Sequence, residues 1–472
     1  MLTFAVFVVV FGGMIFIHEF GHFIVARIFN IPVEEFGFGI PPRAWRFWRN
    51  KGHLVIGGQK VIIPANYDLP FHWQDGMYEQ ANATVDEIDG KLVLRSIQLV
   101  RSERAQEDMK SIAEMENAPS GGLDIPAAKP VTPGAIALSG ALSEVEPGME
   151  WTINWLPLGG FVRPRGENDP NVPGGLAAVN PWKRIAVLVA GPFMNLLTAV
   201  VVCGIIIAQS GIPIPDKVLI TEVSKNSPAE QAGIQANDVV TQIANTQVED
   251  PDHMIILIRS NLDKPINIVV ERNGQTLTLN ATPLSARIPR GEGALGVGVG
   301  YATQPATPAE VITGSFVQTG VLVYGLASLP VGLLQGSISP EEARFVGLKG
   351  IYDFFGVAIK RDTESRAAIT PPVTQPDNNN QQPISTPTSS QKPTNAVLGL
   401  IAMLSVSLGV FNLMPIPALD GGRILFTLPE ILFRRRIPTH LENTVNGVAF
   451  LLLIGLMLVV NVMDFINPAT LP

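Results

Sequence analysis

Three residues whose types and spacing suit catalysis lie together near the N-terminus: His18, Glu19 and His22, in the segment HEFGH. On a helix, residues four apart share a face, so both imidazoles reach one zinc ion at about 2.0–2.1 Å. Glu19 is turned away from that face and avoids the metal, yet touches a water held by it. Zinc lowers the pKa of such a water toward ~7, and Glu19 is predicted to take its proton and pass it to the leaving amine.

The surroundings of this segment favour a functional role. Two hydrogen-bonded histidines on an ordinary helix are the alternative. Here, however, the segment interrupts an apolar run from Leu2 to Phe29. Ionisable groups inside a membrane span cost roughly 2.5–3.5 kcal/mol each on insertion scales and are by default functional. We therefore expect a catalytic metal site.

A catalytic zinc usually has three protein ligands and one open position. The only cysteine is Cys203, so a cysteine-based site is excluded and the third ligand is His, Asp or Glu. The candidate is Asp420, in NLMPIPALDGGR at 412–423. An ordinary Asp-Gly turn at a membrane exit is the alternative. The same segment carries residues that end a helix and are expected to let the chain turn sharply: Pro415, Pro417, Gly421 and Gly422.

The composition indicates a membrane protein with soluble parts. Hydrophobic residues make up 46% of the chain and charged residues only 16%, against about 25% charged in a typical soluble domain. The net charge of -8 gives no reason to expect a nucleic-acid partner. The apolar N-terminus lacks a basic n-region and a small-residue cleavage site, so we expect a retained transmembrane helix.

Four stretches are long enough to cross a bilayer, which takes about 20 apolar residues. A fifth, Val311–Leu334, is rich in Gly and small polar residues and is expected to be interfacial. The predicted fold is a polytopic α-helical membrane protein of about four transmembrane helices, with a membrane-associated β-hairpin or sheet and an inserted extracytoplasmic α+β domain. The predicted order is a first span (1–30), a β region (31–184) with an insert at about 50–150, a second span (185–210), a small domain (215–300), amphipathic helices (301–361), a low-complexity linker (362–394), a third span (395–422), a basic loop (423–444) and a fourth span (445–466).

Lys and Arg positions predict the orientation. They follow span one, precede span two and lie between spans three and four. Both termini and the small domain are therefore expected outside the cytoplasm, and the loops 30–184 and 420–444 inside. The HEFGH segment and Asp420 then lie at similar depth, toward the cytoplasmic side.

The soluble segments have weaker signals. Val33–Trp48 and Trp151–Val162 have β-type patterns. Between them we expect a helix over Ser102–Glu116 and a loop over Ser120–Pro147. In the small domain, Asn273–Gly274 predicts a hairpin turn.

These motifs together resemble the site-2 proteases, and specifically their PDZ-containing bacterial branch. The resemblance is carried by HEFGH at 18–22, NLMPIPALDGGR at 412–423, GPFMN at 191–195, LPLGGFV at 156–162 and the domain at 218–283. It implies His18, His22 and Asp420 as zinc ligands, Glu19 as the catalytic acid/base, and a β-hairpin that presents extended substrate to the zinc. It places four further residues near the substrate or the ligands: Asn412, Asn195, Gly159 and Gly160. For each asparagine, a helix–helix hydrogen bond is the alternative.

The resemblance also extends to the small domain. Ser227-Pro-Ala229, Ala232-Gly233 and Asn237-Asp238 resemble a PDZ domain, with Asn237 where a Gly is usual. Such domains bind extended peptides by strand addition, which would filter substrates outside the membrane.

The predicted function is zinc-dependent endopeptidase activity within the bilayer, on transmembrane proteins or peptides such as anti-sigma factors or remnant signal peptides. One alternative is a non-catalytic zinc-binding PDZ scaffold, but a scaffold has no need of Glu19. Another is a metal transporter, but transporters usually show repeated halves and several polar groups along a path. This chain shows one polar cluster and no repeat.

Overall fold

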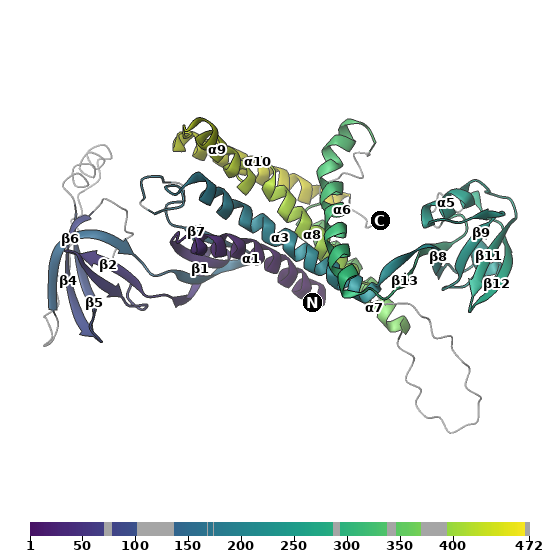
Figure 1. Cartoon of the computed structure of the whole chain (residues 1–472), viewed down its shortest axis with the longest axis horizontal. Coiled ribbons are helices and arrows are strands. Elements are labelled where there is room, and N and C mark those ends of the chain that lie inside the picture. The colour runs from purple at the N-terminus through teal and green to yellow at the C-terminus, as the bar shows by residue number, and fades with distance from the viewer. Residues whose placement is uncertain are drawn as a thin grey trace, which may run out of the picture. The chain divides into compact units, whose positions relative to one another are not determined.

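The computed structural model describes residues 1–69, 78–101, 136–167, 169–172, 174–286, 293–337, 346–369 and 394–467 (Figure 1). The chain folds into two compact units. The first comprises residues 2–195 and 408–456, and the second comprises Met1, 196–407 and 457–472.

Within the described residues, five helices are long and apolar enough to cross a membrane, which makes the chain a polytopic membrane protein. The segment expected to be interfacial is part of one of them. They are α1 (Leu2–Ile28), α3 (Pro181–Ser210), α6 (Pro308–Leu334), α8 (Ala396–Leu413) and α10 (Thr439–Ile466).

Two further helices change the predicted layout. Helix α7 spans Leu348–Ile369, so the first part of the predicted linker is helical, while residues 370–393 lie outside the described part of the chain. Helix α9 spans Asp420–Phe433. The predicted basic loop 423–444 is therefore mostly helix, because α9 and α10 leave only residues 434–438 between them.

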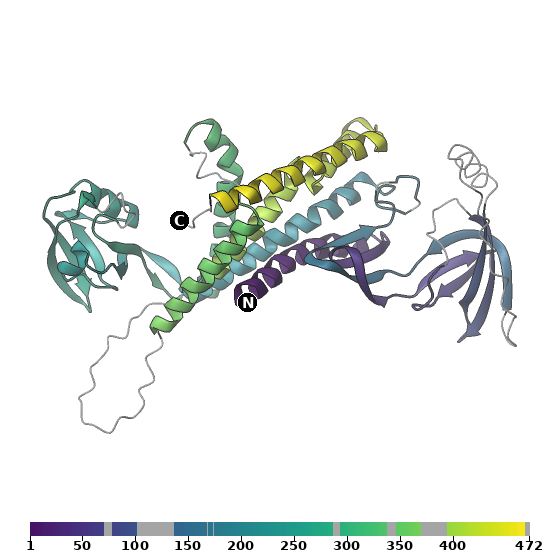
Figure 2. The ribbon, with the colours of Figure 1, turned by 180° about the vertical axis from the view of Figure 1, so that it is seen from behind.

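In the first unit, strands β1 (Val33–Arg49) and β7 (Glu150–Pro164) run beside α1 in both views (Figures 1 and 2). They pair along more than one register. Residues 33–38 pair with 160–164 and also with 150–153, while residues 43–49 pair with 150–154. The resulting sheet has four segments in the order 43–49, 150–154, 33–38 and 160–164. This confirms both predicted β segments.

Two irregularities in β1 separate the side chains of this sheet by type. The register skips Ala44 and Phe47, and each extra residue re-aims the side chains after it, as β-bulges do. One face is aromatic: Phe36 stacks on Trp151 at 5.0 Å between ring centroids and meets Phe16 of α1 at 5.4 Å. The other face carries charged and polar side chains. The aromatic face thus fastens the sheet to α1.

The predicted insert between the two β segments is a closed barrel. Its strands are β2 (Gly52–Ile56), β3 (Gln59–Ile63), β4 (Tyr78–Ile88), β5 (Lys91–Arg101) and β6 (Ile136–Glu146), in the order β2-β3-β5-β4-β6. Leu54, Val61 and Val85 are fully buried in its core. The loop predicted over Ser120–Pro147 is wrong for its last part, which forms β6. The helix predicted over Ser102–Glu116 lies outside the described residues.

The second unit contains a small α+β domain with its own core. Its hairpin turn is the predicted one: Asn273 and Gly274 both have positive φ, at 50° and 78°. The sheet order is β12-β11-β9-β8-β13. The elements are β8 (Ile212–Val223), α4 (Pro228–Gln231), β9 (Val239–Ile243), β10 (Thr246–Gln247), α5 (Pro251–Arg259), β11 (Ile266–Arg272), β12 (Gln275–Ala281) and β13 (Val297–Gln304).

Candidate active site

The two histidines of HEFGH lie on one face of α1, as predicted. Both are buried, with 8% of His18 and 9% of His22 exposed. Their Nε2 atoms are 3.2 Å apart. The i, i+4 spacing on a continuous helix is sufficient to bring them together.

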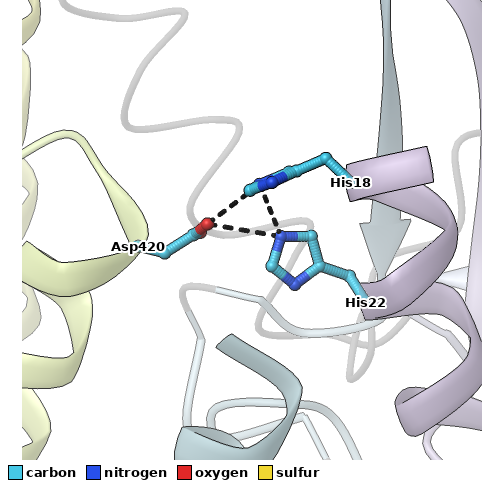
Figure 3. Close-up of side chains that lie close together, drawn as sticks. All are labelled: His18, His22 and Asp420. Atoms are coloured by element: carbon cyan, nitrogen blue, oxygen red, sulfur yellow. Dashed lines mark hydrogen bonds and ion pairs between the residues drawn. The ribbon is translucent and has the colours of Figure 1, made fainter. Parts of the chain in front are cut away.

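Asp420 joins this pair from a position 402 residues later in the sequence. Its Oδ2 lies 3.1 Å from Nε2 of His18 and 3.4 Å from Nε2 of His22 (Figure 3). Atoms bonded at about 2.0 Å to one tetrahedral zinc lie about 3.3 Å apart. The three donor atoms therefore have the spacing that zinc requires, and two imidazoles with one carboxylate are a suitable ligand set.

The loop before Asp420 sets its position. Helix α8 ends at Leu413, ahead of Pro415 and Pro417. Ala418 has φ 73° and donates its N–H to Oδ1 of Asn446 on α10 at 3.0 Å. The chain then enters α9 with Asp420 as its first residue.

Gly421 and Gly422 have a different role from the predicted one. The positive φ belongs to Ala418, and both glycines are helical. A Cβ on Gly421 would lie 2.5 Å from the carbonyl oxygen of Leu413, and one on Gly422 would lie 2.7 Å from Cα of Pro417. The glycines let the start of α9 pack directly on the loop backbone.

The outer nitrogens of both histidines have partners on α3. Nδ1 of His22 donates to the carbonyl oxygen of Val187 at 2.7 Å, and Nδ1 of His18 lies 3.2 Å from the side-chain amide of Asn195. Gly191 lies between these two partners in the sequence, and a Cβ there would be 2.8 Å from Nε2 of His18. Both Nε2 atoms are thereby aimed at Asp420.

Glu19 lies against the edge of the sheet. The N–H of Val162 donates to its Oε2 at 3.1 Å. Gly160 passes close by, since a Cβ on it would lie 3.7 Å from Cγ of Glu19 and 3.0 Å from the carbonyl oxygen of Gly37. Gly159 has φ 106°, which favours glycine. The predicted glycines therefore shape the edge segment at Glu19.

These groups open into one cavity of about 400 Å³, lined by His18, Glu19, His22, Asn412 and Asp420, among others. The side-chain amide of Asn412 donates to the carbonyl oxygen of Leu408 in its own helix at 2.9 Å, so Asn412 lines the cavity with its amide N–H bonded within the helix.

Sequence reasoning missed three charged residues of this cavity: Arg163, Glu167 and Arg423. Arg423 is ion-paired with Glu167. The one sequence signal for Arg423 was its place in the segment that contains Asp420. No sequence signal pointed to Arg163 or Glu167.

A second group with metal-ligand chemistry lies on the barrel. Nδ1 of His53 is 3.0 Å from Glu146 and its Nε2 is 3.4 Å from Glu144. The two carboxylates lie near opposite nitrogens of one ring, and the group is far from Glu19 in the sequence and lines none of the cavity described above.

Comparison with known proteins gives a consistent result. The family model described as peptidase family M50 matches residues 6–57 and 136–456, and so passes over most of the barrel. Zinc metalloprotease RasP of Oceanobacillus iheyensis is 26% identical over 481 residues, covering 98% of both chains. RasP of Shouchella clausii is 26% identical over 472 residues, again covering 98% of both. A Clostridium perfringens protein, named as a candidate zinc metalloprotease, is 30% identical over 321 residues, covering 68% of this chain and 84% of its own.

Proposed function

The chain belongs to peptidase family M50 and is a membrane zinc metalloprotease, and we propose that it hydrolyses peptide bonds in or near the transmembrane segments of other proteins. One observation carries the proposal: the donor atoms of His18 and His22, on a helix long and apolar enough to span a membrane, meet that of Asp420 from α9, and Glu19 lies on the same helix as the histidines. A catalytic site within a span acts on bonds that soluble proteases do not reach.

In this proposal His18, His22 and Asp420 would hold the zinc. Bound there, zinc acts as a Lewis acid and makes water a nucleophile near neutral pH. Val187 and Asn195 fix the imidazole orientations through the outer nitrogens, the usual arrangement behind metal-binding histidines.

Glu19 moves the proton. Its carboxylate takes a proton from the attacking water and delivers it to the nitrogen that leaves when the C–N bond breaks. The N–H of Val162 keeps one carboxylate oxygen turned toward the sheet. The other oxygen is then available to the water.

The sheet edge beside Glu19 suits an extended substrate. A helical segment hides its carbonyls, so the cut site must unwind, and an unwound backbone in lipid needs hydrogen-bond partners. Residues 160–164 are the outer segment of the sheet, paired on one side with 33–38. We assign this edge to strand pairing with the substrate, with Asn412 as an amide available to the substrate backbone.

The aromatic face supports the predicted membrane association of the sheet. Beyond the part that packs on α1, Trp45 and Trp48 are each 62% exposed. Trp is enriched where membranes meet water. These side chains are proposed to lie at that level.

The domain of β8–β13 is proposed to be the PDZ-like substrate filter. Strand β13 ends the sheet, and in the described part of the chain it pairs with β8 alone. Helix α5 contacts β13, and Ile255 and Ile256 of that helix are exposed. An extended peptide is proposed to add to β13 and place its side chains against α5.

Lys and Arg near the spans support the proposed orientation. Both termini and the PDZ-like domain are assigned to the extracytoplasmic side, and the active site to the cytoplasmic half of the membrane.

The test is cleavage of a single-span reporter by purified protein in detergent, with bound zinc assayed in parallel. Wild type and Glu19→Gln should both bind one zinc. Glu19→Gln should cut about 10²–10⁴-fold more slowly, whereas Glu87→Gln, an exposed carboxyl on the barrel, should match wild type. Wild type that holds zinc but cuts none of a varied panel would favour a non-catalytic zinc-binding scaffold. Absence of zinc from both proteins would contradict the ligand set.

A further inference from the structure

The barrel is joined to the substrate-presenting sheet by two short links that pack backbone to backbone. Strand β1 ends one side at Arg49, and β7 begins the other at Glu150. The N–H of Asn50 donates to the carbonyl oxygen of Met149 at 2.9 Å. A Cβ on Gly52 would lie 2.5 Å from the backbone nitrogen of Gly148. The links therefore have little slack.

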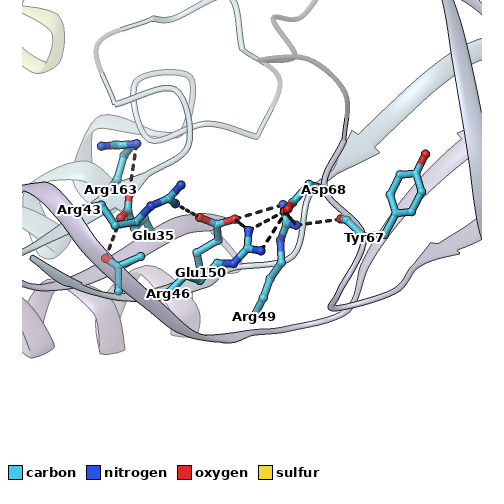
Figure 4. Close-up of polar contacts among 9 residues, drawn as sticks. Glu35, Arg43, Arg46, Arg49, Tyr67, Asp68, Glu150 and Arg163 are labelled. Carbon is cyan, nitrogen blue, oxygen red and sulfur yellow. Dashed lines mark hydrogen bonds and ion pairs between the residues drawn. The ribbon is translucent and has the colours of Figure 1, made fainter. Parts of the chain in front are cut away.

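The barrel also holds the outer sheet segment through its β3–β4 connection. Asp68 accepts hydrogen bonds from Arg46 at 2.6 Å and from Arg49 at 2.8 Å, and Arg49 also donates to the carbonyl oxygen of Tyr67 at 2.8 Å (Figure 4). The Tyr67 side chain packs on the barrel core. The same two arginines pair with Glu150, at 3.0 and 3.2 Å. Asp68 thus joins the barrel core to the charged face of the sheet.

A second polar cluster lies on the same face, at the catalytic edge. Glu35 accepts a hydrogen bond from Thr152 at 2.8 Å and is ion-paired with Arg163 at 3.2 Å (Figure 4). Glu35 and Thr152 are buried. Arg163 lines the active-site cavity and follows Val162, whose N–H is bonded to Glu19.

One row of the sheet joins the two clusters. Arg49 is the register partner of Glu150, Glu150 of Glu35, and Glu35 of Arg163. The row crosses all four segments, and each acid is paired with an arginine on its own side. The Cβ atoms of register partners on one face lie about 4.5–5.5 Å apart. Arginine contacts join the outer pairs of the row, and the backbone pairing of Glu150 with Glu35 joins the two middle segments, so a shift at one end is passed to the next segment.

From these contacts we infer that the barrel positions the catalytic edge: Asp68 holds the outer segment, and the row Arg49–Glu150–Glu35–Arg163 carries that constraint to Val162 beside Glu19. Asp68, Glu35 and Arg163 are positioning residues, and whatever displaces the barrel changes how substrate is presented. The expected change in kcat/KM rests on the proposed proteolysis, whereas the expected change in hydrogen exchange at Val162 does not.

The test compares full-length wild type with Asp68→Ala, with Asp68→Glu as conservative rescue. The matched control is Asp86→Ala, a barrel acid paired with Arg95 at 3.5 Å and away from the sheet. Three quantities are measured: bound zinc, kcat and KM on the reporter, and hydrogen exchange of the Val162 amide. Asp68→Ala should keep zinc, accelerate exchange at Val162 and lower kcat/KM by about 2- to 30-fold, the range seen for residues that transmit coupling. Asp68→Glu should recover part of the loss, and Asp86→Ala should resemble wild type.

A second variant separates transmission from local damage. In a Glu35→Gln background, Asp68→Ala should have little further effect, because the row is already interrupted. Losses in kcat/KM that add in the double variant would overturn the inference. So would a Val162 amide that exchanges at the wild-type rate in Asp68→Ala while the amides of β4 and β5 stay protected from exchange. Hydrogen exchange measures the coupling between Asp68 and Val162 even if the protein cuts none of the reporters. Failure of the proposed proteolysis can therefore be told apart from failure of this inference.

Discussion

The side-chain amide of Asn195 lies 3.2 Å from Nδ1 of His18, the ring nitrogen that faces away from Asp420. Asn195 is fully buried. For Nε2 of His18 to bind a metal, Nδ1 must carry the proton, and the partner it needs is then an acceptor. The amide atom at 3.2 Å is Nδ2, and a half-turn of the amide, which exchanges its nitrogen and oxygen, places Oδ1 there as that acceptor.

Asn195 should therefore control zinc affinity. Asn195→Ala is expected to weaken zinc binding by about 10- to 100-fold, the usual effect of removing the partner of a metal-binding histidine. Asn195→Asp keeps an acceptor and should retain most of the affinity. Competition with a chromophoric chelator measures both. Asn412→Ala is the control, because Asn412 lines the same cavity but bonds to its own helix. Equal zinc affinity in Asn195→Ala and wild type would contradict this role.

Gly191 should be intolerant of any side chain. A Cβ at this position would lie 2.8 Å from Nε2 of His18 and closer still to His22, in the space where the ligand atoms meet. Gly191→Ala is expected to abolish zinc binding and cleavage while the protein stays folded. Gly204→Ala on the same helix is the control, because its nearest neighbour would be at an ordinary 3.6 Å. The measurements are zinc content and helical circular dichroism. A zinc-replete Gly191→Ala protein would show that the imidazoles lie elsewhere.

Zinc should serve catalysis more than folding. Asp420→Ala removes one of the three proposed ligands and is expected to lose zinc and activity together. The helices of the spans, by contrast, keep their internal hydrogen bonds in lipid with or without metal. Chelation of wild type should likewise stop cleavage, and added zinc should restore it. Loss of the helical signal on chelation would point to a structural metal, and stoichiometric zinc in folded Asp420→Ala would remove Asp420 from the site.

The local parts of the site were predictable because their patterns are local. His18 and His22 are one helical turn apart, so their shared face follows from the spacing alone. The Asn273–Gly274 turn is similarly a short-range signal. Asp420 required more, since it is 402 residues from His18. The agreement of the predicted membrane topology and the family resemblance of its segment were the two indications that the residues meet.

The barrel and the charged face were not predictable in this way. Strands β2 and β3 have five residues each, which is too short for a clear alternation, and β3 pairs with the distant β5. In β1, the skipped residues Ala44 and Phe47 interrupt the period of two. Arg46 and Arg49 are three residues apart and would point to opposite faces of a regular strand, but the skipped residue puts them on the same face.

The contact between Asp68 and the arginines has a predictable pH dependence. The hydrogen bond from Arg46 lowers the pKa of Asp68 below its ordinary 3.8. A group with a depressed folded-state pKa contributes stability above its unfolded pKa and loses it as pH falls through the folded value. The contact should therefore be intact at neutral pH and break only below about pH 3.8. Carbon-13 NMR of labelled Asp carboxyls tests this, with Arg46→Gln expected to return the pKa toward 3.8. A wild-type Asp68 that titrates above 3.8 would refute the assignment.

Arg272 should be essential to the stability of the small domain. Asp238 is fully buried, and Arg272 holds it with two hydrogen bonds, at 2.7 and 2.8 Å. Removing one partner of a buried ion pair leaves an uncompensated charge and costs about 3–5 kcal/mol. Arg272→Met is therefore expected to lower the free energy of unfolding of residues 211–305 by roughly that amount. Denaturant unfolding measures it, and the double variant Arg272→Met/Asp238→Leu should recover part of the loss because no buried charge remains. A loss below about 1 kcal/mol, typical of an exposed pair, would mean that water reaches Asp238.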